Sequence, residues 1–333
     1  MAAMRAERPL LAILIRLAAA IALTIMFTLV KLVEAHDVSL VESIFYRQAL
    51  ALPLVLGWLW AGPGLASVRT KRLGAHGWRT LIGLTGMALN FSTYLLLPLA
   101  EATVILFTTP IFATILSALI LKEKVGRHRW SAVVVGFVGV ALVVDPRNAA
   151  LPPLGVAVGL TAALVVAGVS ITLRQIGRTE SATTTVFWFT VMGTAALALA
   201  MPVAARVHDV PTFGLLLALG ITGALAQLGL TASLRLAPVS VVLPIDYSNL
   251  IWAALIGWLV FGTVPGPTLW AGAPLIIGSG LYIVYREHRL KRRATSAAGP
   301  ADIAEVEGED EVDGGDEVEG GDGPETGAEP APR

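Results

Sequence analysis

The sequence predicts an all-α integral membrane protein with ten transmembrane helices, arranged as two inverted five-helix repeats. Its composition, its long apolar runs and a weak internal repeat support this prediction. Of the 333 residues, 55% are hydrophobic and 14% are charged, whereas soluble domains are about 45–50% apolar and about 25% charged. This excess of apolar surface indicates that the chain folds in the hydrocarbon of a membrane.

Ten apolar runs have the length of a transmembrane helix, for which about 20 residues span about 30 Å of hydrocarbon. Their continuous apolar character favours helices over barrel strands, in which polar and apolar residues alternate. The first run follows two arginines, but it is too long for a secretory signal and lacks a clear cleavage site. The runs cover residues 10–33, 41–61, 78–96, 99–121, 129–145, 152–173, 184–203, 212–233, 238–261 and 268–285.

The basic residues predict the orientation of these helices. On the opposite side from the main group, the connections carry only Lys31, Arg147 and Arg206. The positive-inside rule therefore predicts cytoplasmic N- and C-termini and an even number of crossings. We expect a multi-pass protein in the lipid bilayer of a bacterial inner (cytoplasmic) membrane. The main group comprises Arg5, Arg8, Arg16, Arg69, Lys71, Arg72, Arg79, Lys122, Lys124, Arg127, Arg129, Arg174, Arg178, Arg235 and the bases of residues 286–293.

A weak internal repeat suggests two related halves. Leu99-Ala100 reappears 137 residues later as Leu236-Ala237. Because each half contains five crossings, an odd number, the second copy enters the membrane from the other side. We therefore predict repeats over residues 1–146 and 147–293, with a binding site between them near the midplane of the bilayer. This arrangement suits alternating access and is the main reason to predict transport.

The C-terminal segment, residues 294–333, is strongly acidic and contains the run GEDEVDGGDEVEGGD. It has almost no aromatic or branched apolar residues to bury, so we expect a disordered cytoplasmic tail. The tail could dock on a basic partner, although a solvated and dispensable extension is the favoured interpretation.

Two charged residues within the apolar runs are the first candidates for a substrate site, because a charge at the centre of a membrane helix costs about 2.5–3.5 kcal/mol on insertion scales. Asp246 lies in the ninth run after Pro244, and it could pair with a cationic substrate group, exchange a proton or be structural. Arg47 lies about two turns into the second run. It could bind a carboxylate or phosphate, neutralise Asp246 or extend toward the outer interface.

Polar and aromatic residues on the same runs could complete the site. They could line a cavity by hydrogen bonding or stacking, but interhelical hydrogen bonds and ordinary packing explain many such residues. Pro110 and Pro244 lie at matching depths of the fourth and ninth runs, so paired kinks could act as gates or be static. The further site candidates are Asn90, Tyr94, Gln227, Tyr247, Asn249 and Trp188.

Several function classes lack support in the sequence. There is no cysteine, which excludes disulfides and thiolate catalysis. No Walker loop or hydrolase motif is present, and the five histidines are scattered, so we expect no enzyme, cofactor or metal. Transport energy would come from a gradient, through a coupled proton or an exchanged solute. We expect a small-molecule substrate and no nucleic-acid partner.

The stretch LAEATVILFTTPIFATILSALILKEKVGRHRWSAVVVGFVGVALVV resembles the EamA-like family of the drug/metabolite transporter (DMT) superfamily. The later stretch VFGTVPGPTLWAGAPLIIGSGLYIVYREHR resembles the second copy of its repeat, so the resemblance covers residues 10–289. It implies ten helices, inverted repeats, cytoplasmic termini and a central cavity. Thr263 stands where the glutamate matched by Glu123 usually recurs, which weakens the internal symmetry at one loop.

The resemblance implies secondary active transport of a small organic metabolite by alternating access. The substrates it implies are amino-acid, nucleoside-like or cofactor-like solutes. The Asp246-Tyr247 pair and the ending LYIVYREHR are similar to members that handle S-adenosylmethionine or riboflavin. A multidrug or amino-acid efflux pump is an alternative, and an integral-membrane enzyme or a non-transporting scaffold are alternatives from other classes.

Overall fold

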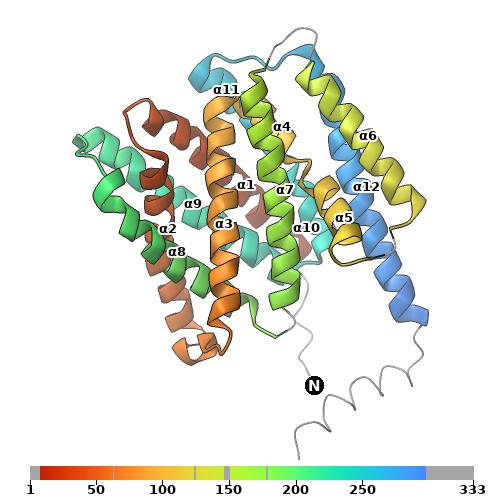
Figure 1. The fold of residues 1–333 in the computed structure, drawn as a ribbon, viewed down its shortest axis with the longest axis horizontal. Coiled ribbons are helices and arrows are strands. Elements are labelled where there is room, and N and C mark those ends of the chain that lie inside the picture. Colours follow the sequence, from red (N-terminus) through yellow and green to blue (C-terminus); the bar gives the residue numbers. More distant parts are fainter. Residues whose placement is uncertain (1–7, 63, 124, 146–150, 178, 298–333) are drawn as a thin grey trace, which may run out of the picture. The chain divides into compact units, whose positions relative to one another are not determined.

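The computed structural model describes residues 8–297 except residues 63, 124, 146–150 and 178 (Figure 1). Every regular element in these ranges is a helix, and none is a β-strand. The helices are α1 (Pro9–Glu34), α2 (Leu40–Ala61), the short 3-10 helix η1 (Leu65–Val68), α3 (Leu73–Leu96), α4 (Leu99–Leu106), α5 (Thr109–Leu119), α6 (Arg127–Val144), α7 (Pro153–Ile176), α8 (Ala182–Ala204), α9 (Val210–Leu236), α10 (Val239–Asp246), α11 (Asn249–Phe261) and α12 (Pro267–Ala297).

The described residues confirm the all-α membrane fold. Nine of the ten predicted spans, with α4–α5 and α10–α11 each counted as one, are long and apolar enough to cross a membrane. The remaining span, α3, has 24 residues and so a length of about 36 Å, but it is too polar to meet the same criterion. The predicted repeat boundaries stay a prediction, and the predicted disorder of the tail concerns residues 298–333, which lie outside the described part.

The fourth and ninth spans are each interrupted in the middle. The short helices α4 and α10 have 8 residues each, and α5 and α11 continue after two residues in a helical backbone conformation. Pro110 has no N–H to donate to the carbonyl of Leu106, and the hydroxyl of Thr109 donates to that carbonyl instead, at 2.7 Å. Each interruption lies close to one of the two prolines, but Pro110 follows the first interruption, at the start of α5, whereas Pro244 precedes the second, within α10.

The two interruptions are equivalent and meet in space. Phe107 follows α4 at the position where Tyr247 follows α10, and both are 9 residues from the proline that precedes each short helix. The two rings contact edge to face, with centroids 4.8 Å apart. Contact between equivalent residues is expected where a pseudo-twofold axis relates two inverted repeats.

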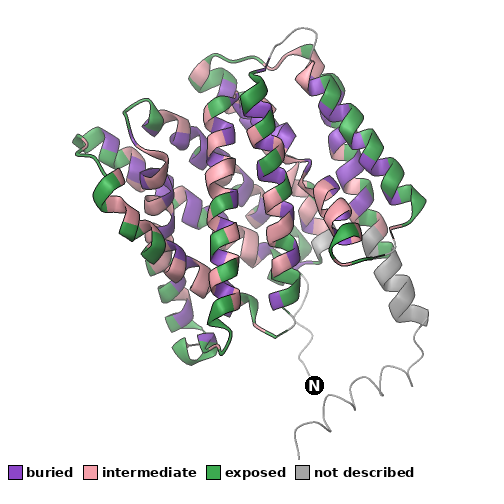
Figure 2. Cartoon of the chain, viewed as in Figure 1, coloured by how far each residue is buried: buried purple, intermediate pink, exposed green. Residues whose placement is uncertain are grey.

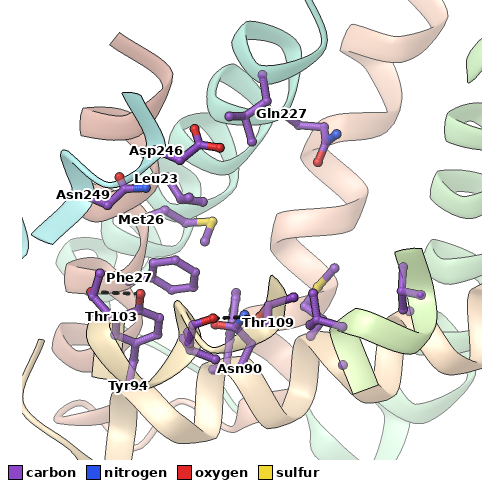
Figure 3. Close-up of a pocket in the computed structure, with 18 of the residues that line it drawn as sticks. Leu23, Met26, Phe27, Asn90, Tyr94, Thr103, Thr109, Gln227, Asp246 and Asn249 are labelled. Atoms are coloured by element: carbon purple, nitrogen blue, oxygen red, sulfur yellow. Dashed lines mark hydrogen bonds between the residues drawn. The ribbon is translucent and has the colours of Figure 1, made fainter. Parts of the chain in front are cut away.

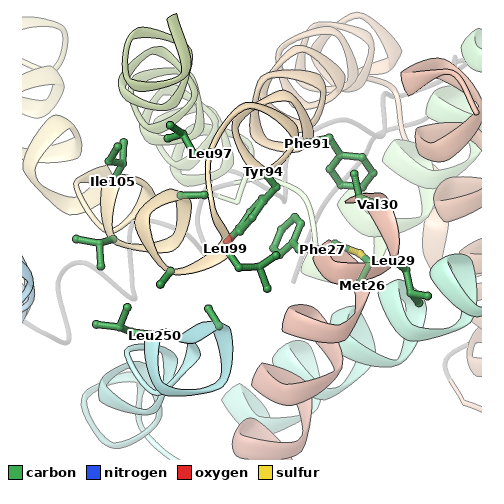
Figure 4. Close-up of a cluster of buried hydrophobic side chains, with 14 of the residues drawn as sticks. Met26, Phe27, Leu29, Val30, Phe91, Tyr94, Leu97, Leu99, Ile105 and Leu250 are labelled. Carbon is green, nitrogen blue, oxygen red and sulfur yellow. The ribbon is translucent and has the colours of Figure 1, made fainter. Parts of the chain in front are cut away.

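The largest apolar core surrounds α1. This helix packs against α3 from its own half and against α9, α10 and α11 from the other half. Phe91, Leu99 and Ile105 are at most 1% exposed in this core (Figure 4). The central position of α1 means that the two halves share one core.

Helices α6 and α12 lie side by side (Figure 1) and approach each other through glycines. A Cβ atom on Gly139 of α6 would lie 2.9 Å from the carbonyl oxygen of Gly272 on α12. Small residues allow such close backbone approach in membranes, where packing rather than the hydrophobic effect holds helices together.

Many large apolar side chains are among the exposed residues of the helical body, and Figure 2 shows exposed positions along the outer helices in green. Trp60, Leu199 and Val203 are more than four-fifths exposed, which is unusual for large apolar residues of soluble proteins. A surface of this kind suits contact with lipid. It agrees with the long apolar helices in indicating a multi-pass membrane protein.

Lys31 connects α1 to the end of α3. Its ammonium donates hydrogen bonds to the carbonyl oxygens of Tyr94, at 2.6 Å, and Leu97, at 3.0 Å. It also lies 5.9 Å from the centre of the Phe261 ring. A cation at this place satisfies carbonyls that the helix end leaves free and interacts favourably with the helix dipole.

We expect Lys31→Met to lower the free energy of unfolding by about 1.5–3 kcal/mol, the usual contribution of hydrogen bonds from a charged donor. Thermal unfolding of the purified protein in detergent would show a lower midpoint. Lys71→Met, at an exposed position, is the matched control. Equal midpoints for the two variants would contradict the role of Lys31.

Candidate substrate-binding site

A cavity of about 490 Å³ lies inside the helical body, within the usual range for small-molecule sites. Residues from both halves of the chain line it, including residues beside both helix interruptions (Figure 3). The lining comprises Arg16, Leu23, Thr24, Met26, Phe27, Arg47, Arg79, Gly83, Gly86, Met87, Asn90, Phe91, Tyr94, Thr103, Leu106, Phe107, Thr109, Val166, Val169, Phe189, Gln227, Leu230, Asp246 and Asn249.

Helix α3 contributes a complete face to this cavity. Arg79, Gly83, Met87, Asn90 and Tyr94 follow one another at spacings of three or four residues, which places them on one side of a helix. Three of the polar residues that make α3 the least apolar span, Arg79, Asn90 and Tyr94, therefore face the cavity rather than lipid.

One wall of the cavity is aromatic. The rings of Phe27 and Tyr94 are stacked, with centroids 3.9 Å apart and planes inclined by 17°. Phe91 meets Phe27 edge to face at 5.9 Å, and the Tyr94 hydroxyl is 3.2 Å from that of Thr103. The wall is thus held in place from three helices, α1, α3 and α4, and it gives this side of the cavity an aromatic lining.

Asp246 forms a two-point ion pair with Arg16. The Nε and Nη2 atoms of Arg16 donate to the two carboxylate oxygens at 2.6 and 2.5 Å. Nη1 of Arg16 also donates to the carbonyl of Leu230 and to Ser233 on α9. The pair therefore joins α1 to α9 and α10, and it leaves no net charge on Asp246 and Arg16 together.

This pairing corrects two of our interpretations. Arg16 was assigned to the basic residues at the membrane surface, but its side chain is 6% exposed and lines the cavity. The suggestion that Arg47 neutralises Asp246 is also wrong, because Arg16 occupies both carboxylate oxygens. The partners are 230 residues apart in the chain, so no local sequence signal could have paired them.

Arg47 extends into the cavity rather than toward the outer interface. Its Nη1 atom donates to the side-chain oxygen of Gln48 at 3.0 Å and lies 3.3 Å from the sulfur of Met87. Its aliphatic part passes beside Gly223, where a Cβ atom would lie 3.0 Å from Cγ of Arg47. Its Nε atom is buried and has no hydrogen-bond partner in the described part of the chain.

Arg79 is a cavity residue that our sequence analysis assigned to the cytoplasmic surface. Its guanidinium lies over the ring of Phe189, 4.3 Å from the centroid. Its Nε and Nη1 atoms are buried and without hydrogen-bond partners among the described residues. The spacing of 11 residues between Arg79 and Asn90, about three helical turns, is the sequence signal that could have placed both on one helix face.

Three amide side chains complete the polar part of the lining: Asn90, Gln227 and Asn249. The Asn90 Oδ1 atom has no partner among the described residues, and Thr24 donates to the Asn249 side chain at 3.3 Å. Amides both donate and accept hydrogen bonds, so this part of the cavity can bind hydroxyl or imide groups.

Six of the eight candidate residues line the cavity, and Tyr247 and Trp188 do not. Tyr247 lies behind the lining, against Phe107, at the interruption between α10 and α11. Trp188 donates from its indole nitrogen to the carbonyl of Val68 at 2.9 Å, which connects α8 to η1. A substrate role for each of the eight stays a prediction. The described residues contain no group of three or more metal-binding side chains.

We expect Arg16→Met or Asp246→Leu alone to destabilise the protein by about 3 kcal/mol, because each leaves a buried charge without its partner. The double variant should be closer to the wild type than either single variant. A double-mutant cycle of thermal unfolding in detergent measures this coupling. Additive effects would show that the pair does not contribute as a unit.

The comparisons with known proteins agree with this architecture. The model of the EamA-like transporter family matches residues 10–145 and 153–285. The riboflavin transporters of Vibrio cholerae and Rhizobium johnstonii are both 32% identical, over 76% and 69% of this chain and 85% and 76% of their own lengths. The S-adenosylmethionine uptake transporter of Rickettsia felis is 27% identical over 75% of this chain and 83% of its own length. The chain therefore belongs to the EamA-like transporter family and is a multi-pass transporter of small metabolites.

Proposed function

We propose that this protein transports riboflavin, or a closely related flavin, by alternating access. The observation that carries the proposal is the cavity lining, which combines a stacked aromatic wall, three amides and two arginines that have no carboxylate partner among the described residues. The similarity to riboflavin transporters adds support.

The chemistry of riboflavin fits each part of this lining. Its three-ring system is flat and has apolar faces, and it can pack against the aromatic lining formed by Phe27 and Tyr94. Its two ring carbonyls accept hydrogen bonds, which arginines donate, and its imide and polyol groups suit the amides of Asn90 and Gln227. No part of the molecule requires a negatively charged partner.

The charge of the cavity favours a flavin over S-adenosylmethionine. Three arginines and one aspartate line it, and Arg16 and Asp246 neutralise each other. Arg47 and Arg79 then leave a positive balance in a site of low dielectric constant. The sulfonium cation of S-adenosylmethionine would be repelled there, because like charges interact strongly where water is scarce.

In the proposed cycle, the Arg16–Asp246 ion pair closes one side of the cavity. The Arg16–Asp246 pair ties α1 of the first half to α10 of the second half, on the side of the cavity where α1 begins. If the N-terminus is cytoplasmic, the pair closes the cytoplasmic side. Opening would separate Arg16 from Asp246, and the released carboxylate could then accept a proton and couple transport to a gradient.

The orientation can be tested with introduced cysteines, since the natural sequence contains none. We expect Val207→Cys, in the connection between α8 and α9 and fully exposed, to react with an impermeant maleimide added to intact spheroplasts. Lys71→Cys, in the connection before α3, should react only after the membrane is permeabilised. The reverse pattern would contradict cytoplasmic termini in an inner membrane.

We expect proteoliposomes that contain the protein to accumulate radiolabelled riboflavin when a proton gradient is imposed. Unlabelled riboflavin should compete, and S-adenosylmethionine should not. Phe27→Leu should raise KM about two- to tenfold, since an aromatic contact contributes about 0.5–1.5 kcal/mol.

The matched control is Phe137→Leu. This residue also forms an edge-to-face pair, with Phe112 at 5.8 Å, but it is outside the cavity lining. If S-adenosylmethionine inhibited uptake and unlabelled riboflavin did not, the flavin proposal would be wrong and the substrate would be a cation. Equal changes in KM in the Phe27→Leu and Phe137→Leu variants would show that the aromatic wall does not contact the substrate.

A further inference from the structure

We propose that Arg47 and Arg79 form a single acceptor-binding subsite, which holds the carbonyl-bearing end of the flavin ring and so orients the substrate in the cavity. This inference rests on the proposed function, and it assigns a role to Arg79 that the sequence did not suggest. The contacts of the two guanidinium groups with α3 carry the argument.

Both guanidinium groups lie against the same face of α3. Arg79 extends along its own helix to Gly83, where a Cβ atom would collide with Nη1. Arg47 reaches across from α2 to the sulfur of Met87, at 3.3 Å. Gly83 and Met87 are one turn apart, with a rise of about 6 Å, so the two cations approach the cavity at neighbouring levels.

Neither cation has a negatively charged partner in this site. Asp246 is the one acidic residue of the cavity lining, and Arg16 binds both of its carboxylate oxygens. Buried nitrogens without partners in the described residues remain on Arg47 and on Arg79. Unsatisfied buried donors are costly, so a ligand rich in acceptor oxygens would relieve this cost.

The surroundings hold Arg79 ready for such a ligand. The Phe189 ring covers one face of the Arg79 guanidinium, with its centroid 4.3 Å from the central carbon of that group. The N–H groups point outward in the plane of the guanidinium, so the ring does not prevent them from donating hydrogen bonds. Gly83 provides the necessary space, because a Cβ atom there would meet both Arg79 and the Phe189 ring. Arginine presents several donors in a fixed plane, unlike lysine.

The position of the aromatic wall indicates which end of the flavin reaches the arginines. Tyr94 lies seven residues beyond Met87 on α3, or about 10 Å along the helix. A three-ring system can bridge this distance, with its apolar dimethylbenzene end on the wall of Phe27 and Tyr94. Its pyrimidine end, which carries both carbonyls, then lies at Arg47 and Arg79.

The test is a double-mutant cycle between protein and ligand. Dissociation constants would be measured with the full-length protein in detergent, by displacement of tritiated riboflavin with riboflavin, 2-thioriboflavin and 4-thioriboflavin. Sulfur accepts hydrogen bonds more weakly than oxygen, so each thio compound removes an acceptor while keeping the ring. The variants are Arg47→Lys and Arg79→Lys, which retain the charge, and Gly83→Ala, which displaces Arg79 without replacing it.

We expect the wild type to bind at least one thio compound about tenfold more weakly than riboflavin. Each variant should bind riboflavin about tenfold more weakly than the wild type does and should discriminate less than threefold between riboflavin and that thio compound. Arg235→Lys, at an exposed arginine 4.5 Å from the Trp58 ring, and Gly168→Ala, with open space around it, should behave as the wild type. Unfolding midpoints would identify any variant that is misfolded.

The outcomes separate the two proposals. Variants that keep the full discrimination, or that bind riboflavin as the wild type does, would overturn the arginine subsite and leave flavin transport standing. A folded wild type that binds no riboflavin would overturn both. Loss of discrimination in Gly83→Ala, with Arg79 still present, would support the subsite independently of any charge change.

Discussion

Backbone groups that a helix leaves free inside hydrocarbon must find partners within the protein, and this chain interrupts two helices at that depth. The hydroxyls of Thr108 and Thr109 donate to the carbonyls of Ile105 and Leu106, at 2.6 and 2.7 Å. These local bonds make the interruption after α4 tolerable without help from water. The two interruptions contact each other through Phe107 and Tyr247, and the cavity lies beside them. The position of the site thus follows from where the helices can be broken.

The backbone is nearly symmetric around this place, whereas the side chains are not. Leu106 precedes one interruption where Asp246 precedes the other, and Thr109 follows where Asn249 follows. All four residues line the cavity. A symmetric scaffold suits a cycle in which the two halves exchange roles. Recognition of one solute requires an asymmetric lining, and Arg47, Arg79 and the Arg16–Asp246 ion pair supply it.

Much of this architecture could be predicted because it follows from local rules. Apolar length identified the spans, and Pro110 and Pro244 indicated paired interruptions. Asn90 and Asp246 were selected because polar and charged groups are costly in hydrocarbon, and a residue kept there at such a cost is expected to have a function. Arg16 and Arg79 were assigned to the surface because the positive-inside rule counts bases near helix ends and is blind to the direction of a side chain. Arg79 extends inward along α3 to Gly83, and only the packing of Phe189 and α3 reveals this.

Some of the buried polar atoms that lack partners lie in the cavity lining, where a ligand can offset their cost. Arg47, Arg79 and Asn90 keep buried polar atoms without partners among the described residues, although a fully satisfied lining would be more stable. Natural proteins often break local rules at functional sites and compensate elsewhere. Here the compensation includes the shared core around α1 and the paired charges of Arg16 and Asp246. A substrate that satisfies the free donors stabilises the cavity while bound. Its release returns the cost, so the unsatisfied donors favour binding, and the opening of the cavity must supply the free energy for release.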